Sequence, residues 1–218
     1  MIHSQQLLGG VPERLIGAVL KTVVRASVPW VRIPPPPGFL TKFRGVSFIS
    51  TGYNSRQRIK NGYEVLVKIY TDGACSGNPG KGGYGTILIA EDENGIVHKK
   101  ELTQGFRLTT NNRMELLAAI AGLEALKKPC DVEIISDSKY LVDAFKQSWI
   151  DGWIKKGWRN SNKQPVKNKD LWERLLKAKE PHKVKFIWIK GHNGHEYNEC
   201  CDKMAVNSSN SGSLLEDL

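Results

Sequence analysis

Four acidic residues stand where a fold could bring their carboxylates together. Two follow apolar stretches that look like strands, and two lie within helical patterns; they are Asp72, Glu115, Asp137 and Asp202. Carboxylates that share a small site repel one another and lose solvation, so they need a cation between them. Oxygen ligands that leave coordination positions open suit magnesium or manganese. The alternative for each acid alone is a solvated side chain or a helix cap.

The elements that must position these acids can be expected from residue periodicity. Strands are expected over residues 64–71, 84–90, 96–106, 132–135 and 184–189, with a glycine-rich turn over 73–85. Helices are expected over residues 111–126, 138–145, 169–178 and 198–206. This order is typical of a mixed α/β domain. If the first and fourth strands are neighbours, Asp72 and Asp137 leave the same end of the sheet, and packed helices bring Glu115 and Asp202 to them.

The residues around the four acids form motifs that point to one family. In chain order the motifs are Tyr70–Gly80, Thr109–Glu115, Ser136–Ser138 and Gly191–Asp202. Together they closely resemble ribonuclease H of type I, in its bacterial branch, and the resemblance covers residues 64–207. It implies a ribonuclease H-like fold, with a five-stranded mixed sheet of three antiparallel and two parallel strands flanked by helices.

The resemblance also implies a reaction. It predicts an endonuclease that hydrolyses the RNA strand of RNA/DNA hybrids with two metal ions, giving 5′-phosphate and 3′-hydroxyl ends. Asp72, Glu115, Asp137 and Asp202 are expected to hold two Mg²⁺ ions, with Mn²⁺ as a possible substitute. His192, in a glycine-flanked loop, is expected to shuttle a proton or assist product release. A solvated loop histidine is the alternative for His192.

Substrate contacts are expected by the same resemblance. Asn78, Asn111 and Asn112 resemble contacts to the minor groove, where RNA shows its 2′-hydroxyls. Thr110 and Arg113 are expected near a DNA phosphate. Trp149, Trp153 and Lys156 are expected along the DNA strand, although each tryptophan has a place in the core as its alternative. Lys139 departs from the glutamine that is often found at its position in bacterial relatives.

The positive charge of the chain is unevenly distributed. The net charge is +10, and residues 1–63 supply +8 of it, from nine Lys/Arg and the single acid Glu13. Within the remainder, residues 155–190 hold twelve Lys/Arg against three acids, close to Trp153, Trp158 and Trp172. This cluster predicts a positive surface for nucleic acid. A solvated helical face is the alternative.

Residues 1–63 and 208–218 are expected to lie outside the domain. The first segment is basic, contains the run Pro34–Pro37 and lacks a regular period, so we expect it to be disordered. It resembles a transit peptide, and it also resembles a translated transfer-RNA gene included by a start codon assigned too early. The second segment is expected to be a polar tail.

Several classes of protein are excluded by composition. No window of about 18 uncharged apolar residues is present, which excludes a predicted membrane span. Four cysteines without a CxxC pair make neither a disulfide framework nor a zinc site, so we expect a reducing compartment, the cytoplasm. The protein is also expected to be a monomer. Two alternatives to the stand-alone enzyme are a non-catalytic hybrid-binding protein and the nuclease domain of a reverse transcriptase. The intact acids argue against the first, and the absence of a polymerase region argues against the second.

Overall fold

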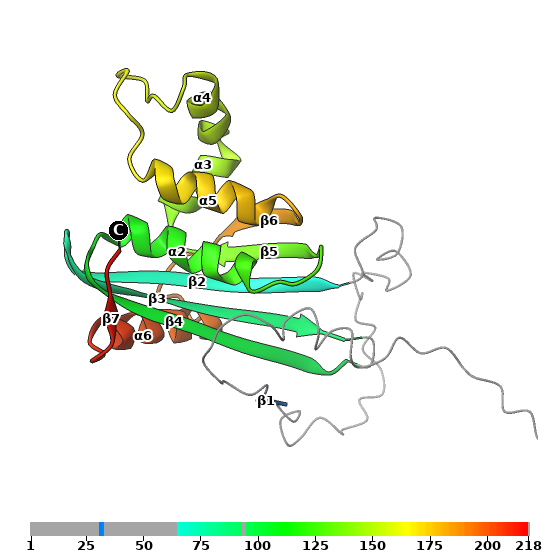
Figure 1. Cartoon of the computed structure of the whole chain (residues 1–218). Helices are drawn as coiled ribbons and strands as arrows, with labels where there is room; N and C mark the ends of the chain where they lie inside the picture. Colours follow the sequence, from blue (N-terminus) through cyan, green and yellow to red (C-terminus); the bar gives the residue numbers. More distant parts are fainter. Residues whose placement is uncertain (1–30, 33–64, 93–94, 218) are drawn as a thin grey trace, which may run out of the picture.

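A single mixed sheet forms the centre of the computed structural model, which describes residues 31–32, 65–92 and 95–217 (Figure 1). Its strands are β1 (Val31–Arg32), β2 (Leu66–Gly77), β3 (Gly80–Glu91), β4 (Val97–Thr109), β5 (Asp131–Ser136), β6 (Lys183–Trp188) and β7 (Leu214–Leu215). In the described parts, the strand order is β1-β4-β3-β2-β5-β6, and β7 pairs with β4. The order places β2 beside β5 at the centre of the sheet.

The predicted mixed sheet is confirmed. Strands β2, β3 and β4 are antiparallel neighbours, while β5 and β6 run parallel to β2. Two strands of two residues each, β1 and β7, add to β4, and a two-residue strand is too short to produce a sequence period. Apart from β1, the prediction for residues 1–63 falls outside the described residues.

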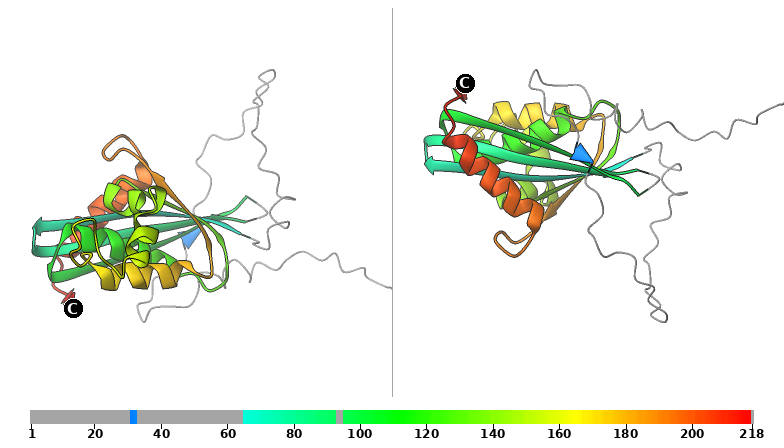
Figure 2. Two further views of the ribbon diagram at one scale, coloured as in Figure 1. Left: turned by 90° about the horizontal axis from the view of Figure 1, so that it is seen from above. Right: turned by 90° about the horizontal axis from the view of Figure 1, so that it is seen from below.

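Helices cover both faces of this sheet. Their bounds are α2 (Asn111–Glu124), α3 (Lys139–Lys146), α4 (Trp149–Lys155), α5 (Lys169–Lys179) and α6 (Glu196–Ser209). Helix α6 lies on one face, and α2, α3 and α5 lie on the other (Figures 1 and 2). Helix α4 and the loop over residues 156–168 extend away from the sheet, and together they are called the α4 extension (Figure 1). Within the described ranges, none of the helices is both long and apolar enough to span a membrane.

Helix α2 is buried around most of its circumference. Met114, Leu116, Ile120 and Leu123 are almost fully inaccessible, and so is Ala118. Such burial follows from the position of α2, which packs on β2 and β3 on one side and on α5 on the other. A helix held between two layers has little freedom to move. The side chains that α2 directs toward the sheet are therefore firmly placed.

The expected glycine-rich turn is wrong in its extent. Strands β2 and β3 continue through it as one hairpin, and only Asn78 and Pro79 lie between them. The glycines allow close approach of helices rather than a long turn. A Cβ at Gly83 would overlap the Ser208 hydroxyl, and one at Gly85 would overlap the main-chain carbonyl of Cys201. Bare backbone on β3 therefore lets α6 lie directly on the sheet.

An aromatic cluster joins α3, α5 and the extension that carries α4. Trp172 is fully buried, packs edge-on against Trp153 at 5.6 Å between centroids, and donates from Nε1 to the Tyr140 hydroxyl at 3.0 Å. Phe145 stacks on Phe186 of β6 at 3.8 Å. Buried aromatic pairs stabilise beyond their area. The extension is thus anchored to the domain at its base.

His182 links α5 to β5 as a buried, neutral imidazole. Its side chain is buried, and Nδ1 accepts a hydrogen bond from the main-chain N–H of Cys130 at 3.3 Å. Burial lowers the pKa of His182 below its usual value of 6.5. As the pH falls below 6.5, the unfolded chain therefore takes up a proton before the folded chain does, and stability is lost.

Replacing His182 by Asn should remove this pH dependence while keeping an acceptor for Cys130. We expect the difference in unfolding free energy between the parent and His182→Asn to shrink as the pH is lowered from 7.5 to 5.5. Denaturant unfolding at several pH values measures this difference, and groups that titrate equally in both proteins cancel. Parallel pH profiles would contradict the assignment.

Candidate active site

Asp72 and Asp137 lie side by side because β2 and β5 are parallel neighbours. Thr71 pairs with Ser136, so the two acids follow at adjacent positions of the two strands. This juxtaposition agrees with the expectation from the sequence, although Asp72 lies within β2 rather than after it. Parallel strands bring their carboxyl ends to one edge of a sheet, which is where α/β folds commonly place their sites.

Asp137 is fixed by several contacts that the sequence did not indicate. The indole N–H of Trp188 donates to the main-chain oxygen of Asp137 at 3.0 Å. A Cβ at Gly191 would overlap the carboxylate of Asp137, so the loop backbone after β6 lies against this side chain. Ser138 begins α3 as its N-cap and accepts from the Leu141 N–H at 3.3 Å. Asp137 is held between two well-defined elements.

Glu115 reaches the same point from the first turns of α2. Gly73 makes this approach possible, since a Cβ on it would lie 2.5 Å from the main-chain nitrogen of Glu115. Asp72, Glu115 and Asp137 each present a carboxylate oxygen, and these oxygens lie within 4.8 Å of one another. Asp72 and Glu115 are buried, and Asp137 is half-buried.

The electrostatics of this group require a positive partner. Burial, followed by the charge of Asp137, raises the pKa of Asp72 to about 7 against a hydrogen bond from Gly73 N–H. Burial, and then the charges of Asp72 and Asp137, raise the pKa of Glu115 well above its usual value. Oε2 of Glu115 is buried with no hydrogen-bond partner among the described residues. An all-oxygen donor set with an unsatisfied buried oxygen fits a divalent cation.

Asp202 and His192 lie at the margin of this group. Asp202 is on α6, partly exposed, and its charge contributes to the raised pKa of Asp72. His192 is exposed in the loop between β6 and α6, with a φ of 51°. That left-handed conformation is uncommon for a residue with a side chain. The structure brings Asp202 toward the three clustered acids, and the role of His192 stays a prediction.

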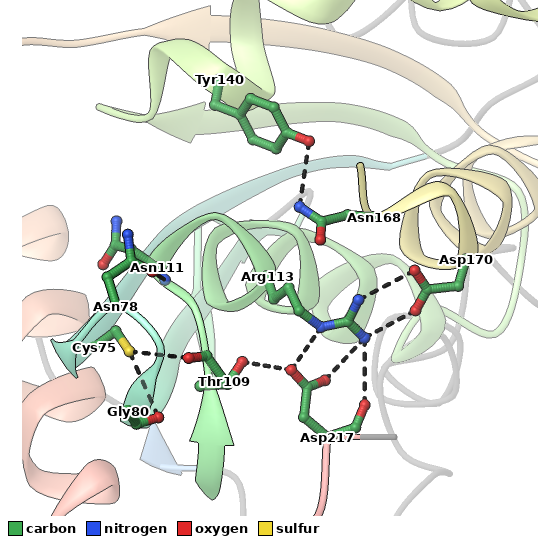
Figure 3. Close-up of polar contacts among 10 residues, drawn as sticks. All are labelled: Cys75, Asn78, Gly80, Thr109, Asn111, Arg113, Tyr140, Asn168, Asp170 and Asp217. Carbon is green, nitrogen blue, oxygen red and sulfur yellow. Dashed lines mark hydrogen bonds and ion pairs between the residues drawn. The ribbon is translucent and has the colours of Figure 1, made fainter. Parts of the chain in front are cut away.

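The predicted minor-groove asparagines connect the β2–β3 hairpin to the start of α2. The main-chain N–H of Asn111 donates to Asn78 Oδ1 at 3.4 Å, and Nδ2 of Asn111 donates to Glu115 Oε1 at 3.4 Å. Figure 3 shows Asn78 and Asn111 facing each other. Asn112 is exposed beside them, and Thr110 is the N-cap residue of α2. Asn111 therefore contacts a carboxylate of the cluster directly, and Asn78 is joined to that carboxylate through Asn111.

Arg113, which the sequence predicted to lie near a DNA phosphate, binds two carboxylates in this structure. Its guanidinium is bound to Asp170, at 2.8 Å from Nη2, and to Asp217, at 2.6 Å from Nε (Figure 3). Burial lowers the pKa of Arg113, and the hydrogen bonds that it donates to both carboxylates outweigh this and raise it. The sequence analysis missed Asp217 because it lies 104 residues from Arg113, in a segment expected to be a polar tail.

Trp149, Trp153 and Lys156 lie on the α4 extension, away from the carboxylates (Figure 1). Trp149 is 36% exposed, which contradicts its alternative place in the core. Trp153 is half-buried against Trp172, and Lys156 is exposed. Lys139 is not on this extension: its ammonium lies over the ring of Trp188 in β6, 5.4 Å from the ring centroid. The extension therefore forms a second candidate surface rather than part of the acidic site.

Comparison with known proteins identifies related sequences and structures. Residues 64–210 match the family described as RNase H. A protein named Ribonuclease H from Lachnoclostridium phytofermentans is 58% identical over 154 residues, which are 70% of this chain and 98% of the relative. A protein of the same name from Rippkaea orientalis is 54% identical over 151 residues, covering 69% of this chain and 90% of the relative.

A solved structure shows the same architecture. It is LC9-RNase H1, described as a type 1 RNase H with the type 2 active-site motif. The alignment has a TM-score of 0.61 at 30% identity and covers 66% of this chain and 72% of the other. The predicted fold class is confirmed by this similarity together with the observed sheet order.

Proposed function

Because the chain belongs to the RNase H family, we propose that it is an endonuclease that hydrolyses the RNA strand of RNA/DNA hybrids. Family membership confirms the predicted enzyme class, a hydrolase of the ribonuclease H type. The observation that carries the proposal is the convergence of Asp72, Glu115 and Asp137 within 4.8 Å at one edge of the sheet. Three carboxylates so close, two of them buried, have no evident structural use without a cation.

The acids are the residues that would hold the cations. We propose that Asp72, Glu115, Asp137 and Asp202 hold two Mg²⁺ ions, with Mn²⁺ as a substitute. When bound, such a pair supplies an activated water and stabilises the leaving oxygen of an in-line phosphodiester displacement, giving 5′-phosphate and 3′-hydroxyl ends. The chain contributes the fixed positions of these ligands. Asp137 is held through Trp188 and the Gly191 backbone, and Glu115 is held by the buried helix α2.

Other residues bind and orient the hybrid in this proposal. Asn78, Asn111 and Asn112 contact the minor groove beside the acids, where 2′-hydroxyls distinguish RNA from DNA. Thr110 contributes to the binding of a DNA phosphate. His192, exposed on its loop, accepts or releases a proton near Asp137. The position of Gly191 against Asp137 supports this placement of the loop.

The α4 extension is proposed as the surface that follows the DNA strand. Trp149, Trp153 and Lys156 lie there, and Lys155 and Lys163 are exposed on the same extension. Exposed lysines contact phosphate groups and release counterions. Tryptophan faces give additional contact area. This surface is separate from the acids, so binding and cleavage can be altered independently.

Replacing Lys155, Lys156 and Lys163 by Gln should weaken binding more than turnover. We expect a higher KM with little change in kcat, and a shallower dependence of affinity on salt, by about 0.7–0.9 in log–log slope for each phosphate that is no longer bound. A matched control replaces the exposed Lys68, Lys127 and Lys128, near the other end of β2 and β5. Equal salt slopes in both triple variants would show that the cluster is only a solvated face.

The proposed function is tested by a cleavage assay with matched substrates. The full chain is incubated with labelled RNA/DNA hybrid, single-stranded RNA and double-stranded RNA of one sequence, with Mg²⁺, with Mn²⁺ and with EDTA. We expect cleavage of the hybrid alone, only with a divalent cation, and products that a ligase requiring a 5′-phosphate can join. An Asp72→Asn preparation controls for contaminating nuclease from the expression host.

Other outcomes select the alternatives. Hybrid binding without cleavage under any metal condition would support the non-catalytic hybrid-binding protein and overturn the proposed reaction. Cleavage of double-stranded RNA at a similar rate would overturn the substrate assignment. The cytoplasmic location and the monomeric state stay predictions, and light scattering of the eluting protein tests the second.

A further inference from the structure

Arg113 binds two carboxylates from distant parts of the chain, and together they fill both edges of its guanidinium (Figure 3). Asp170 accepts from Nη1 at 3.1 Å and from Nη2 at 2.8 Å. Asp217 accepts from Nε at 2.6 Å and from Nη2 at 3.1 Å. An arginine binds carboxylate or phosphate best through two parallel N–H donors on one edge. With both edges occupied, Arg113 has no such pair left for a substrate phosphate.

The hydrogen-bond donors around the Asp217 carboxylate also suit a phosphate group. Besides Arg113, the hydroxyl of Thr109 donates to Asp217 Oδ2 at 2.5 Å. The side chains of Arg113 and Asp217 are only 11% and 5% exposed, so the pair is largely removed from water. A guanidinium and a hydroxyl are common phosphate donors in nucleic-acid complexes. Arg113, which was predicted to lie near a DNA phosphate, is one of these donors. Thr110, which carries the same prediction, is the next residue after Thr109.

The segment that carries Asp217 is otherwise weakly attached. Strand β7 pairs with β4 only at Gly105 and Phe106. Glu216 forms an ion pair with Arg107 at 3.0 Å, but these side chains are 68% and 62% exposed. Exposed ion pairs contribute little to stability. Gln104 of β4 also donates to the main-chain oxygen of Ser213 at 3.4 Å, so the shortest contacts that hold this segment on the domain are those of Asp217 itself.

Asp170 differs from Asp217 in its attachment. It lies in the first turn of α5, next to Leu171 and Trp172, which are buried in the core. The packed helix therefore fixes the backbone of Asp170 beside Arg113, while its carboxylate is 50% exposed. Its bidentate contact fixes the plane of the guanidinium and leaves the Nε edge for another anion.

We propose that Asp217 is a built-in competitor for the substrate phosphate at Arg113, displaced when the hybrid binds, while Asp170 is the positioning residue that keeps Arg113 oriented. This inference rests on the proposed function, because it regulates access to the same substrate. The association constant measured for the hybrid is then the intrinsic constant multiplied by the fraction of molecules in which Asp217 has left Arg113.

The test compares two neighbouring substitutions in the full chain. Asp217→Asn removes the competing charge, and Glu216→Gln is the matched control because it removes one negative charge from the same segment. Binding of a labelled RNA/DNA hybrid is measured by fluorescence anisotropy in EDTA, and KM and kcat are measured with Mg²⁺. We expect Asp217→Asn to lower Kd and KM by roughly threefold to tenfold with kcat unchanged, as the competent fraction rises.

Asp170→Asn should act in the opposite direction. Loss of the bidentate partner frees Arg113 to rotate, so we expect Kd and KM to rise while kcat changes little. An effect through folding alone would lower the melting temperature without separating KM from kcat. Arg113→Lys gives a further comparison, since a point charge cannot bind both anions through paired donors.

A second measurement uses the unaltered chain and does not depend on the stability of any variant. Hydrogen–deuterium exchange is followed at residues 214–217 with and without saturating hybrid in EDTA. Displacement of Asp217 predicts faster exchange when the hybrid is bound. Slower exchange, or equal hybrid affinity for Asp217→Asn and Glu216→Gln, would overturn the inference. If the unaltered chain cleaves the hybrid in these cases, the proposed function still stands. Failure to bind or cleave any hybrid would overturn both.

Discussion

Asp72→Asn should abolish hybrid cleavage and leave the fold intact. The carboxylate of Asp72 lies within 4.8 Å of those of Glu115 and Asp137, and its charge is coupled to both of theirs. An amide cannot supply the negative charge that a shared cation ligand provides. We expect activity to fall by more than about a thousandfold, since loss of even one stabilising donor in an active site commonly costs 10²–10³.

The same substitution should not destabilise the protein when metal is absent. Removal of one carboxylate relieves repulsion within the cluster, so the melting temperature in EDTA should be equal to or above that of the parent. Added Mg²⁺ should raise the melting temperature of the parent more than that of Asp72→Asn.

Asp131→Asn is the control for this experiment. Asp131 lies at the opposite end of β5, where it faces Lys183 at 3.7 Å. The Asp131→Asn variant should keep the parental activity and the parental response to Mg²⁺. Strong magnesium-dependent cleavage by purified Asp72→Asn would refute the assignment of the metal site.

Gly85→Ala should destabilise the domain and also impair activity. A Cβ at Gly85 would overlap the carbonyl oxygen of Cys201, which belongs to the backbone of α6 and cannot turn aside like a flexible side chain. Relief requires α6 to move away from β3, and α6 carries Asp202. Overpacking of this kind typically costs about 1–3 kcal/mol. For a domain of this size, each kcal/mol corresponds to a decrease of about 2–4 °C in Tm.

The position of Gly85 makes the variant informative about the site. Gly85 pairs directly with Asp72 across β2 and β3, so a shift of α6 changes the surroundings of two proposed metal ligands. We expect kcat to fall at temperatures where the variant is still folded, with a weaker stabilisation by Mg²⁺. Thermal unfolding and cleavage assays below the transition measure both effects.

Gly152→Ala provides the matched control for Gly85→Ala. No atom of the described residues lies within 4 Å of a Cβ at Gly152, which is in α4. The exchange should leave Tm unchanged or raise it, because Ala favours a helix over Gly by roughly 0.5–1 kcal/mol. Equal melting temperatures for Gly85→Ala and the parent would mean that α6 does not lie on bare backbone.

The sequence determined most of the catalytic proposal because the relevant residues lie in local motifs. Asp72, Glu115, Asp137 and Asp202 were each marked by their neighbours, and all four were predicted to meet if the first and fourth strands were neighbours; the structure brings the first three within 4.8 Å of one another. The pairing of β2 with β5 was a condition of that prediction, and the structure supplies it. Short-range features of this kind are carried by periodicity, turn residues and caps.

Other properties were decided by tertiary packing. The glycines over residues 73–85 suggested a turn, and only the packing of α2 on Gly73 and of α6 on Gly83 and Gly85 shows that these are strand positions kept free of side chains. Trp188 contacts Asp137 through one hydrogen bond, and no sequence signal distinguishes it from a core tryptophan. In both cases the partner comes from an element distant along the chain.

The partners of Arg113 are the clearest case of contacts that the sequence did not predict. Its motif indicated a phosphate contact, but Asp170 and Asp217 occupy the guanidinium from 57 and 104 residues away. Local pattern records what a residue type can bind, whereas the fold decides which partners reach it. An arginine side chain is long and binds any suitable partner within a few ångströms, so the pairing of Arg113 is set by where α5 and the residues after β7 place their acids.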